Sequence, residues 1–145
     1  TVHLGAVRRR TPPIPMSSRR PIVVDASVII AVALGEPGSA SAAPRLFGAH
    51  VNPVNLAESI IALVRRGLPR GSVERLLAAV QFELVPCDWA LCQQAAEIHA
   101  ATRPLGLSLA DAFCLASAHR LDALLLTADR AWASLQLGVE IELVR

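Results

Sequence analysis

Lysine is absent from this sequence and aromatic residues are scarce. The 145 residues include no tyrosine and only five aromatic residues, two tryptophans and three phenylalanines. These five do not follow the pattern of a base-stacking platform, so the sequence does not support recognition of nucleic-acid bases by stacking. All 14 basic residues are arginines, which excludes chemistry that depends on a lysine side chain.

Cysteine is also rare. The three cysteines, Cys87, Cys92 and Cys114, are an odd number and contain no C-x-x-C pair. This pattern predicts neither a disulfide framework nor a zinc site. We expect buried, reduced thiols, as is typical of cytoplasmic proteins.

Long apolar runs are missing as well. A membrane span needs about 18 uncharged apolar residues in a row, and acidic residues interrupt every apolar stretch before that length. An export signal is not supported either: Arg19 and Arg20 precede an apolar run, but Asp25 ends it after four residues. The sequence therefore predicts a cytoplasmic protein with no membrane partner.

Charge divides the chain into two parts. Five arginines lie in residues 1–20, which mix proline, serine and arginine without a period and are expected to form a flexible leader. Met16 is the only methionine, so we leave open whether residues 1–15 are native. Residues 21–145 suit one domain, in which nine arginines oppose twelve acidic residues, a net charge of −3. The folded part has no polycationic face that would by itself indicate nucleic-acid binding.

Residues 21–145 alternate between strand-like and helix-like segments. The strand candidates are residues 21–25, 49–52, 82–86, 123–127 and 139–144. The helix candidates are residues 27–33, 40–47, 56–66, 72–80, 89–101, 109–121 and 130–135. This alternation predicts an α/β fold with a mainly parallel central sheet. In the last strand, Glu140 and Glu142 alternate with apolar residues, which predicts an edge position.

Four carboxylates stand in apolar surroundings. Asp25 and Asp129 follow strand candidates, and the carboxyl ends of parallel strands form the usual ligand crevice. Glu58 and Asp111 lie near the starts of helix candidates, on faces that we expect to be buried. This arrangement would bring the four acids to one rim of the sheet.

Each acid also has a purely structural interpretation. Asn55-x-x-Glu58 and Ser108-x-x-Asp111 fit capping boxes at helix starts, and Asp25 and Asp129 fit N-caps. The joint pattern favours a site, because four clustered carboxylates repel one another unless a cation compensates. With oxygen ligands only, Mg²⁺ or Mn²⁺ is favoured over zinc. The four histidines are scattered and are expected to be surface or packing residues.

The order of these motifs resembles the PIN domain, and within it the VapC-type toxin ribonucleases of bacterial toxin–antitoxin pairs. The matching pieces are "VVDASVIIA", "VNLAES" and "LSLADAFCLASAHRLDALLLTAD", followed by Arg130 and Trp132, over residues 22–132. The resemblance implies a three-layer α/β/α sandwich with Asp25, Glu58, Asp111 and Asp129 as the catalytic and metal-binding acids. It also implies Ser27 and Thr127 as supporting hydroxyls, a homodimer, and a cognate antitoxin in the active-site groove. Trp132 stands where the family usually carries phenylalanine.

We therefore interpret the chain as a Mg²⁺- or Mn²⁺-dependent endoribonuclease that hydrolyses RNA phosphodiester bonds as the toxin of such a pair. Candidate RNA contacts are Arg103 and Arg130, with Arg65 and Arg66 as further candidates, although each also fits a solvated helix face. The main alternative is a non-catalytic PIN-like module that binds a protein partner. Phosphoryl transfer through Asp25 as nucleophile ranks last, because no second acid adjoins Asp25 and no lysine exists.

Overall fold

The structure is a computed structural model that describes residues 19–144. The predicted leader lies outside the described residues except for Arg19 and Arg20. Arg20 forms an ion pair with Glu140, and its Nε donates to the Asp122 carbonyl at 3.3 Å. The chain is thus attached to the fold from Arg20, two residues before the first strand.

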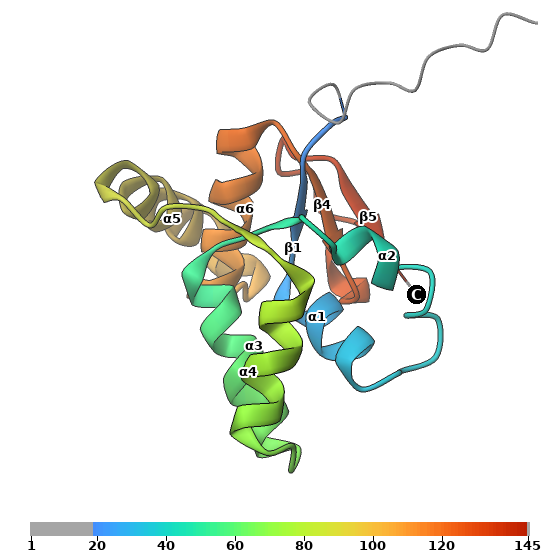
Figure 1. Cartoon of the computed structure of the whole chain (residues 1–145). Coiled ribbons are helices and arrows are strands. Elements are labelled where there is room, and N and C mark those ends of the chain that lie inside the picture. Colours follow the sequence, from blue (N-terminus) through green and yellow to red (C-terminus); the bar gives the residue numbers. More distant parts are fainter. Residues whose placement is uncertain (1–18, 145) are drawn as a thin grey trace, which may run out of the picture.

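Five strands form one central sheet (Figure 1). They are β1 (Ile22–Val24), β2 (His50–Val51), β3 (Glu83–Leu84), β4 (Leu124–Thr127) and β5 (Ile141–Leu143). The order is β3-β2-β1-β4-β5, and all four pairings are parallel. The predicted parallel sheet and the predicted edge position of the last strand are confirmed. Because the strands are parallel, all their carboxyl ends share one rim.

Within the described part of the chain, six helices and two short 3₁₀ turns accompany the strands. They are α1 (Ala26–Ala33), α2 (Ala43–Leu46), α3 (Pro53–Arg65), α4 (Arg70–Val80), α5 (Trp89–Thr102), α6 (Leu109–Leu121), η2 (Arg103–Leu105) and η3 (Arg130–Trp132). Of the helix predicted over residues 40–47, only the turn Ala43–Leu46 forms, and it ends there because Phe47 is extended and Gly48 follows with a φ of +71°. The helix predicted over residues 130–135 is reduced to η3. Within residues 19–144, no helix is both long and apolar enough to cross a membrane.

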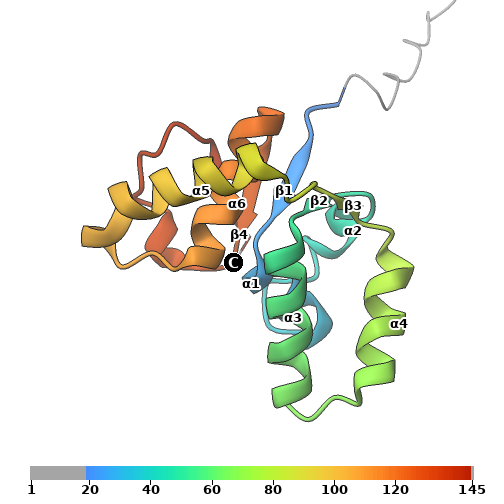
Figure 2. The same ribbon diagram turned by 90° about the vertical axis from the view of Figure 1, so that its left-hand side faces the viewer.

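Side-chain alternation along the two central strands builds the layers. Val24 and Leu126 pack into one core with α1 to α4, whereas Val23 and Leu125 pack into another with α6 and Trp132. Each fully buried aliphatic side chain contributes about 1.5–3 kcal/mol to folding. Figure 2 shows α5 and α6 on one side of the sheet and α1, α3 and α4 on the other. The predicted three-layer α/β/α sandwich is confirmed.

The three cysteines do not share one environment. Cys114 is fully buried, as predicted, but Cys87 and Cys92 are exposed, so the expectation of buried thiols is wrong for these two. In α5 the buried face is formed by Leu91 and Ala95. Since successive helical residues are rotated by about 100°, Cys92 turns away from that face.

Candidate functional site

Asp25 lies at the carboxyl end of β1 and at the N-cap position of α1. Its side chain makes no capping hydrogen bond, so the structural interpretation as a cap does not account for the carboxylate. Only 6% of the residue is exposed. Two hydroxyls hold it instead: Ser27 Oγ donates to Oδ2 at 2.6 Å, and Thr127 Oγ1 donates to the same oxygen at 3.1 Å.

The same two hydroxyls connect β1 to the end of β4. Ser27 Oγ accepts from the Ala128 amide at 2.9 Å, and Thr127 Oγ1 accepts from the Asp129 amide at 3.1 Å. Residues about 100 positions apart in the chain are thereby fixed around one carboxylate. Ser27 and Thr127, the hydroxyls to which the resemblance assigns a supporting role, both donate to the Asp25 carboxylate.

Glu58 lies in the second turn of α3 and is exposed. The predicted capping box from Asn55 to Glu58 is wrong, because α3 begins earlier: Asn52 is the N-cap, and its Oδ1 accepts from the Asn55 amide at 2.9 Å. The expectation that Glu58 lies on a buried face is also wrong, since Ile61, one turn later, is 51% exposed. The face that carries Glu58 is open to solvent.

Asp111 lies in the first turn of α6 and is half-buried. The predicted capping box is confirmed: the Asp111 amide donates to Ser108 Oγ at 3.1 Å, and the Ser108 amide donates to Asp111 Oδ2 at 2.8 Å. Cys114 and Leu115, one turn further on, are buried as expected. A carboxylate has two oxygens, so the cap through Oδ2 and a site function through Oδ1 are compatible.

Asp129 follows β4 and begins η3. Its Oδ1 accepts from the Ala131 amide at 2.9 Å, so the interpretation as an N-cap is confirmed for this residue. Its side chain is exposed. The connection to Asp25 runs through Thr127, whose hydroxyl bonds to both residues.

Asn55 is a residue of this region whose role the sequence did not reveal. Its side chain is fully buried and joins three elements. Oδ1 accepts from the Ala26 amide at 3.2 Å, and Nδ2 donates to the Ala110 carbonyl at 2.9 Å. Ala26 follows Asp25 and Ala110 precedes Asp111, while Glu58 lies one turn along the same helix. The Asn-Pro pair at residues 52 and 53 is the signal that would have placed the helix start correctly.

Three of the four acids interact through their charges. Desolvation by burial is the main cause that raises the pKa of Asp25, and the charge of Asp111 adds to it. The pKa of Glu58 is raised first by desolvation and then by the charges of Asp25 and Asp111. Asp129 is not among the charges that raise either pKa. The structure thus brings Asp25, Glu58 and Asp111 into one electrostatic group, with Asp129 beside it.

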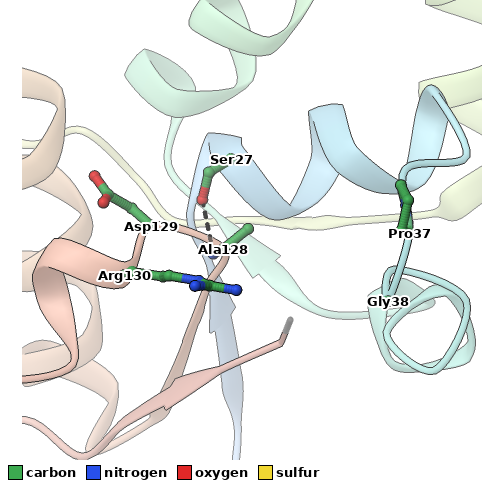
Figure 3. Close-up of a pocket in the computed structure, with 6 residues that line it drawn as sticks. All are labelled: Ser27, Pro37, Gly38, Ala128, Asp129 and Arg130. Atoms are coloured by element: carbon green, nitrogen blue, oxygen red, sulfur yellow. Dashed lines mark hydrogen bonds between the residues drawn. The ribbon is translucent and has the colours of Figure 1, made fainter.

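An open pocket of about 850 Å³ adjoins this group. Its lining residues are Ser27, Pro37, Gly38, Ala128, Asp129 and Arg130 (Figure 3). In Figure 3 the side chains of Asp129 and Arg130 extend in different directions. A second depression, of about 560 Å³, includes Glu58 and Ile61 in its lining. Of the four acids, Asp129 and Glu58 are therefore accessible from these two depressions.

Comparison with known families identifies the fold. The family model of the PIN domain matches residues 22–136, which include all four acids. The chain belongs to the PIN domain family. No curated protein matches it.

Several solved structures share this PIN fold. A toxin–antitoxin complex from Klebsiella pneumoniae aligns with a TM-score of 0.65 at 15% identity, covering 86% of this chain and 98% of that chain. VapBC2 from Rickettsia felis bound to a DNA fragment aligns with a TM-score of 0.64 at 13% identity, covering 83% of this chain and 96% of that chain. FitAcB from Neisseria gonorrhoeae aligns with a TM-score of 0.61 at 17% identity, covering 83% of this chain and 95% of that chain. At these identities the likeness establishes the fold.

The donor atoms of this PIN domain fit a hard divalent cation. Within residues 19–144, no three Asp, Glu, His or Cys side chains stand close enough to ligate one ion together. Mg²⁺ needs no such cage, since it keeps several waters and takes one or two carboxylates directly. Burial, together with the three nearby acids, raises the pKa of the Cys114 thiol well above its ordinary value, so this thiol stays protonated. The available donors are oxygens, and a bound cation would offset the repulsion among the three acids.

The candidate RNA contacts are spread over the surface of the domain. Arg130 lines the larger pocket, and Arg103 is exposed in η2. Arg65 and Arg66 lie at the end of α3, about 10 Å along the helix axis from Glu58 at 1.5 Å per residue. The Arg66 guanidinium lies 3.9 Å from the Glu36 carboxylate, measured from Nη2 to Oε1. Arg130 is thus the candidate arginine that lines the same pocket as Asp129.

Proposed function

We propose that this PIN domain is a Mg²⁺- or Mn²⁺-dependent endoribonuclease of the VapC type and the toxin of a toxin–antitoxin pair. The observation that carries the proposal is the group of Asp25, Glu58 and Asp111 at the carboxyl rim of a parallel sheet, where burial and mutual repulsion raise the pKa values of Asp25 and Glu58. Perturbed carboxylates in an accessible position are typical of functional sites. Similar structures include toxin–antitoxin complexes.

The four acids would have different roles in the site. Asp25 and Asp111 are the proposed direct ligands, Glu58 positions the attacking water, and Asp129 completes the site or helps to hold a second ion. Ser27 and Thr127 fix the carboxylate of Asp25 through its Oδ2. When bound, the cation would supply a water of lowered pKa and neutralise charge on the scissile phosphate.

The substrate and partners follow from the same proposal. The acidic rim repels RNA until a cation binds, so backbone affinity must come from arginines, of which Arg130 and Arg103 are the proposed contacts. We propose a homodimer, a cognate antitoxin that covers the active-site groove, and a cytoplasmic location. These proposals rest on the family resemblance and on the toxin–antitoxin complexes among the similar structures.

An RNA-cleavage assay with and without Mn²⁺ tests the function. We expect Asp25→Asn and Asp111→Asn each to reduce cleavage by more than about 100-fold. Loss of a residue that only orients a metal ligand costs up to about 100-fold, and loss of a direct ligand should cost more. Asp122→Asn is the matched control, because Asp122 is exposed at the other end of α6 and has a left-handed backbone that asparagine tolerates.

Circular dichroism establishes that each variant is folded, and calorimetric titration with Mn²⁺ separates the two interpretations of the domain. A non-catalytic interaction module predicts no Mn²⁺ binding that depends on Asp25 or Asp111. Cleavage that is unchanged in both folded variants would rule out the proposed site.

A further inference from the structure

Cys87 and Cys92 form a close pair of thiols at the start of α5. Their sulfur atoms are 3.9 Å apart, and both residues are exposed. A disulfide has an S–S bond of about 2.05 Å, so the two sulfurs need to approach by about 2 Å. The sequence did not indicate this pair, because a spacing of five residues matches no common cysteine motif.

The backbone around the pair is held in place by Asp88. The Asp88 carboxylate accepts from the Leu91 amide at 2.9 Å and caps α5, while the Asp88 carbonyl accepts from the Cys92 amide at 3.1 Å. Asp88 also pairs with Arg120 of α6 through two hydrogen bonds, at 3.0 and 2.6 Å. Arg120 donates further to the Pro86 carbonyl at 3.3 Å. The turn before α5 is therefore fixed in the shape that places the sulfurs side by side.

After one of these thiols has reacted with an outside disulfide, the proximity of the second thiol favours closure of an internal disulfide. Desolvation, followed by the hydrogen bond with Cys92, raises the pKa of Cys87, which slows its attack on a disulfide in solution. Once either sulfur carries a mixed disulfide, however, the other sulfur is close by, since the two sulfur atoms are 3.9 Å apart. Intramolecular attack at such short range proceeds as if the thiol were present at very high concentration.

We propose that Cys87 and Cys92 are a reversible thiol–disulfide modification site, oxidised by low-molecular-weight disulfides of the glutathione type. The thiolate of one cysteine attacks the small disulfide, forms a mixed disulfide and releases one small thiol. The thiolate of the second cysteine then attacks the protein sulfur of the mixed disulfide and releases the second small thiol. The protein loses two electrons and two protons, and the small disulfide gains them as two thiols.

The third cysteine provides an internal control. Cys114 is fully buried, and its thiol pKa is well above the ordinary value, so it should stay reduced and unlabelled in the folded protein. The site is independent of the proposed nuclease activity, since none of the four acids takes part. Failure of one proposal therefore leaves the other standing.

Intact-protein and peptide mass spectrometry after treatment with oxidised glutathione test the pair. We expect the wild-type chain to lose two hydrogens, with a 87–92 crosslink and no retained glutathione, and to recover its mass with dithiothreitol. Cys87→Ser and Cys92→Ser should each retain one glutathione adduct, because the resolving thiol is missing. Exposed serine is tolerated at both positions.

Three results would overturn the proposal. The first is a wild-type chain that retains glutathione adducts to the same extent as the single variants, which would show that the second thiol does not displace glutathione from the mixed disulfide. The second is a crosslink between two chains on a non-reducing gel in place of the internal one. The third is a wild-type chain that remains unmodified while Cys87→Ser is labelled.

Discussion

At the scale of single residues, Asn55 connects the proposed ligands through the backbone. It bonds to the residue after Asp25 and to the residue before Asp111, and it lies one turn before Glu58. It touches none of the three carboxylates by a described hydrogen bond, so it is a positioning residue. The oxygen and the nitrogen of the buried Asn55 side-chain amide are both hydrogen-bonded. Movement of this side chain is costly, because it would leave a buried polar atom without a partner.

Asn55→Ala should weaken Mn²⁺ binding about 10–100-fold, the cost expected when a residue that orients metal ligands is removed. It should also lower the free energy of unfolding by about 1–3 kcal/mol, since the Ala26 amide and the Ala110 carbonyl lose their partner. Calorimetric titration with Mn²⁺ and urea denaturation measure the two effects separately.

Asn52→Ala is the matched comparison for this prediction. Asn52 is another buried asparagine of the same helix start, and its loss removes an N-cap worth about 0.5–2 kcal/mol. The described hydrogen bond of the Asn52 side chain is accepted from the Asn55 amide, so it connects Asn52 only to its own helix. If both variants lose the same affinity for Mn²⁺, Asn55 acts only by stabilising the helix and the positioning role is refuted.

At the scale of elements, the start of α6 combines stability and site geometry. Ser108 caps the helix through the Asp111 amide, and Asp111 returns a hydrogen bond to the Ser108 amide. The cap therefore fixes the orientation of a proposed metal ligand. An acid in the first turn also interacts favourably with the helix dipole.

Ser108→Ala should lower the free energy of unfolding by about 1 kcal/mol, because one amide of the first turn loses its acceptor. Ser108→Asn should restore most of this loss, since asparagine is among the best N-cap residues. Chemical denaturation of the three proteins measures the effect. An alanine variant as stable as the parent would show that the capping box contributes nothing to stability.

At the scale of the whole molecule, the acidic group makes global stability depend on pH. The folded-state pKa of Asp25 is raised above its ordinary value of 3.8, so in the interval above 3.8 the folded state binds more protons than the unfolded state. Stability is then highest below that interval and falls as the pH rises through the raised pKa. The raised pKa of Glu58 acts in the same direction.

In the absence of divalent cations, Asp25→Asn should therefore be more stable than the parent at neutral pH. The difference should shrink as the pH falls from the raised pKa towards 3.8, and it should be smallest below 3.8, where Asp25 is protonated in both states. Urea denaturation with chelator present, at several pH values, gives the comparison. Asp122→Asn again serves as control, and a stability loss at neutral pH in Asp25→Asn would contradict the assigned direction.

Local patterns in the sequence were sufficient for most of the elements. The alternation of strand and helix candidates predicted the parallel sheet, the edge strand and α6 with its capping box. Such features depend on periodicity and on residues three or four apart, which act through nearby backbone atoms. The start of α3 was misplaced, because Asn52 and Asn55 are both good caps and only the fold decides between them.

By itself, the sequence determined the α/β order of this PIN domain and the identity of its four unusual acids, since both are carried by neighbouring residues. Only the tertiary structure decided how those acids meet: Thr127 reaches Asp25 across 102 positions, Glu58 is open to solvent, and Asp129 stands beside the other three. It also brought the Cys87 and Cys92 sulfurs together. The physical reason is that such distances follow from how helices pack on the sheet, which no short stretch of residues specifies.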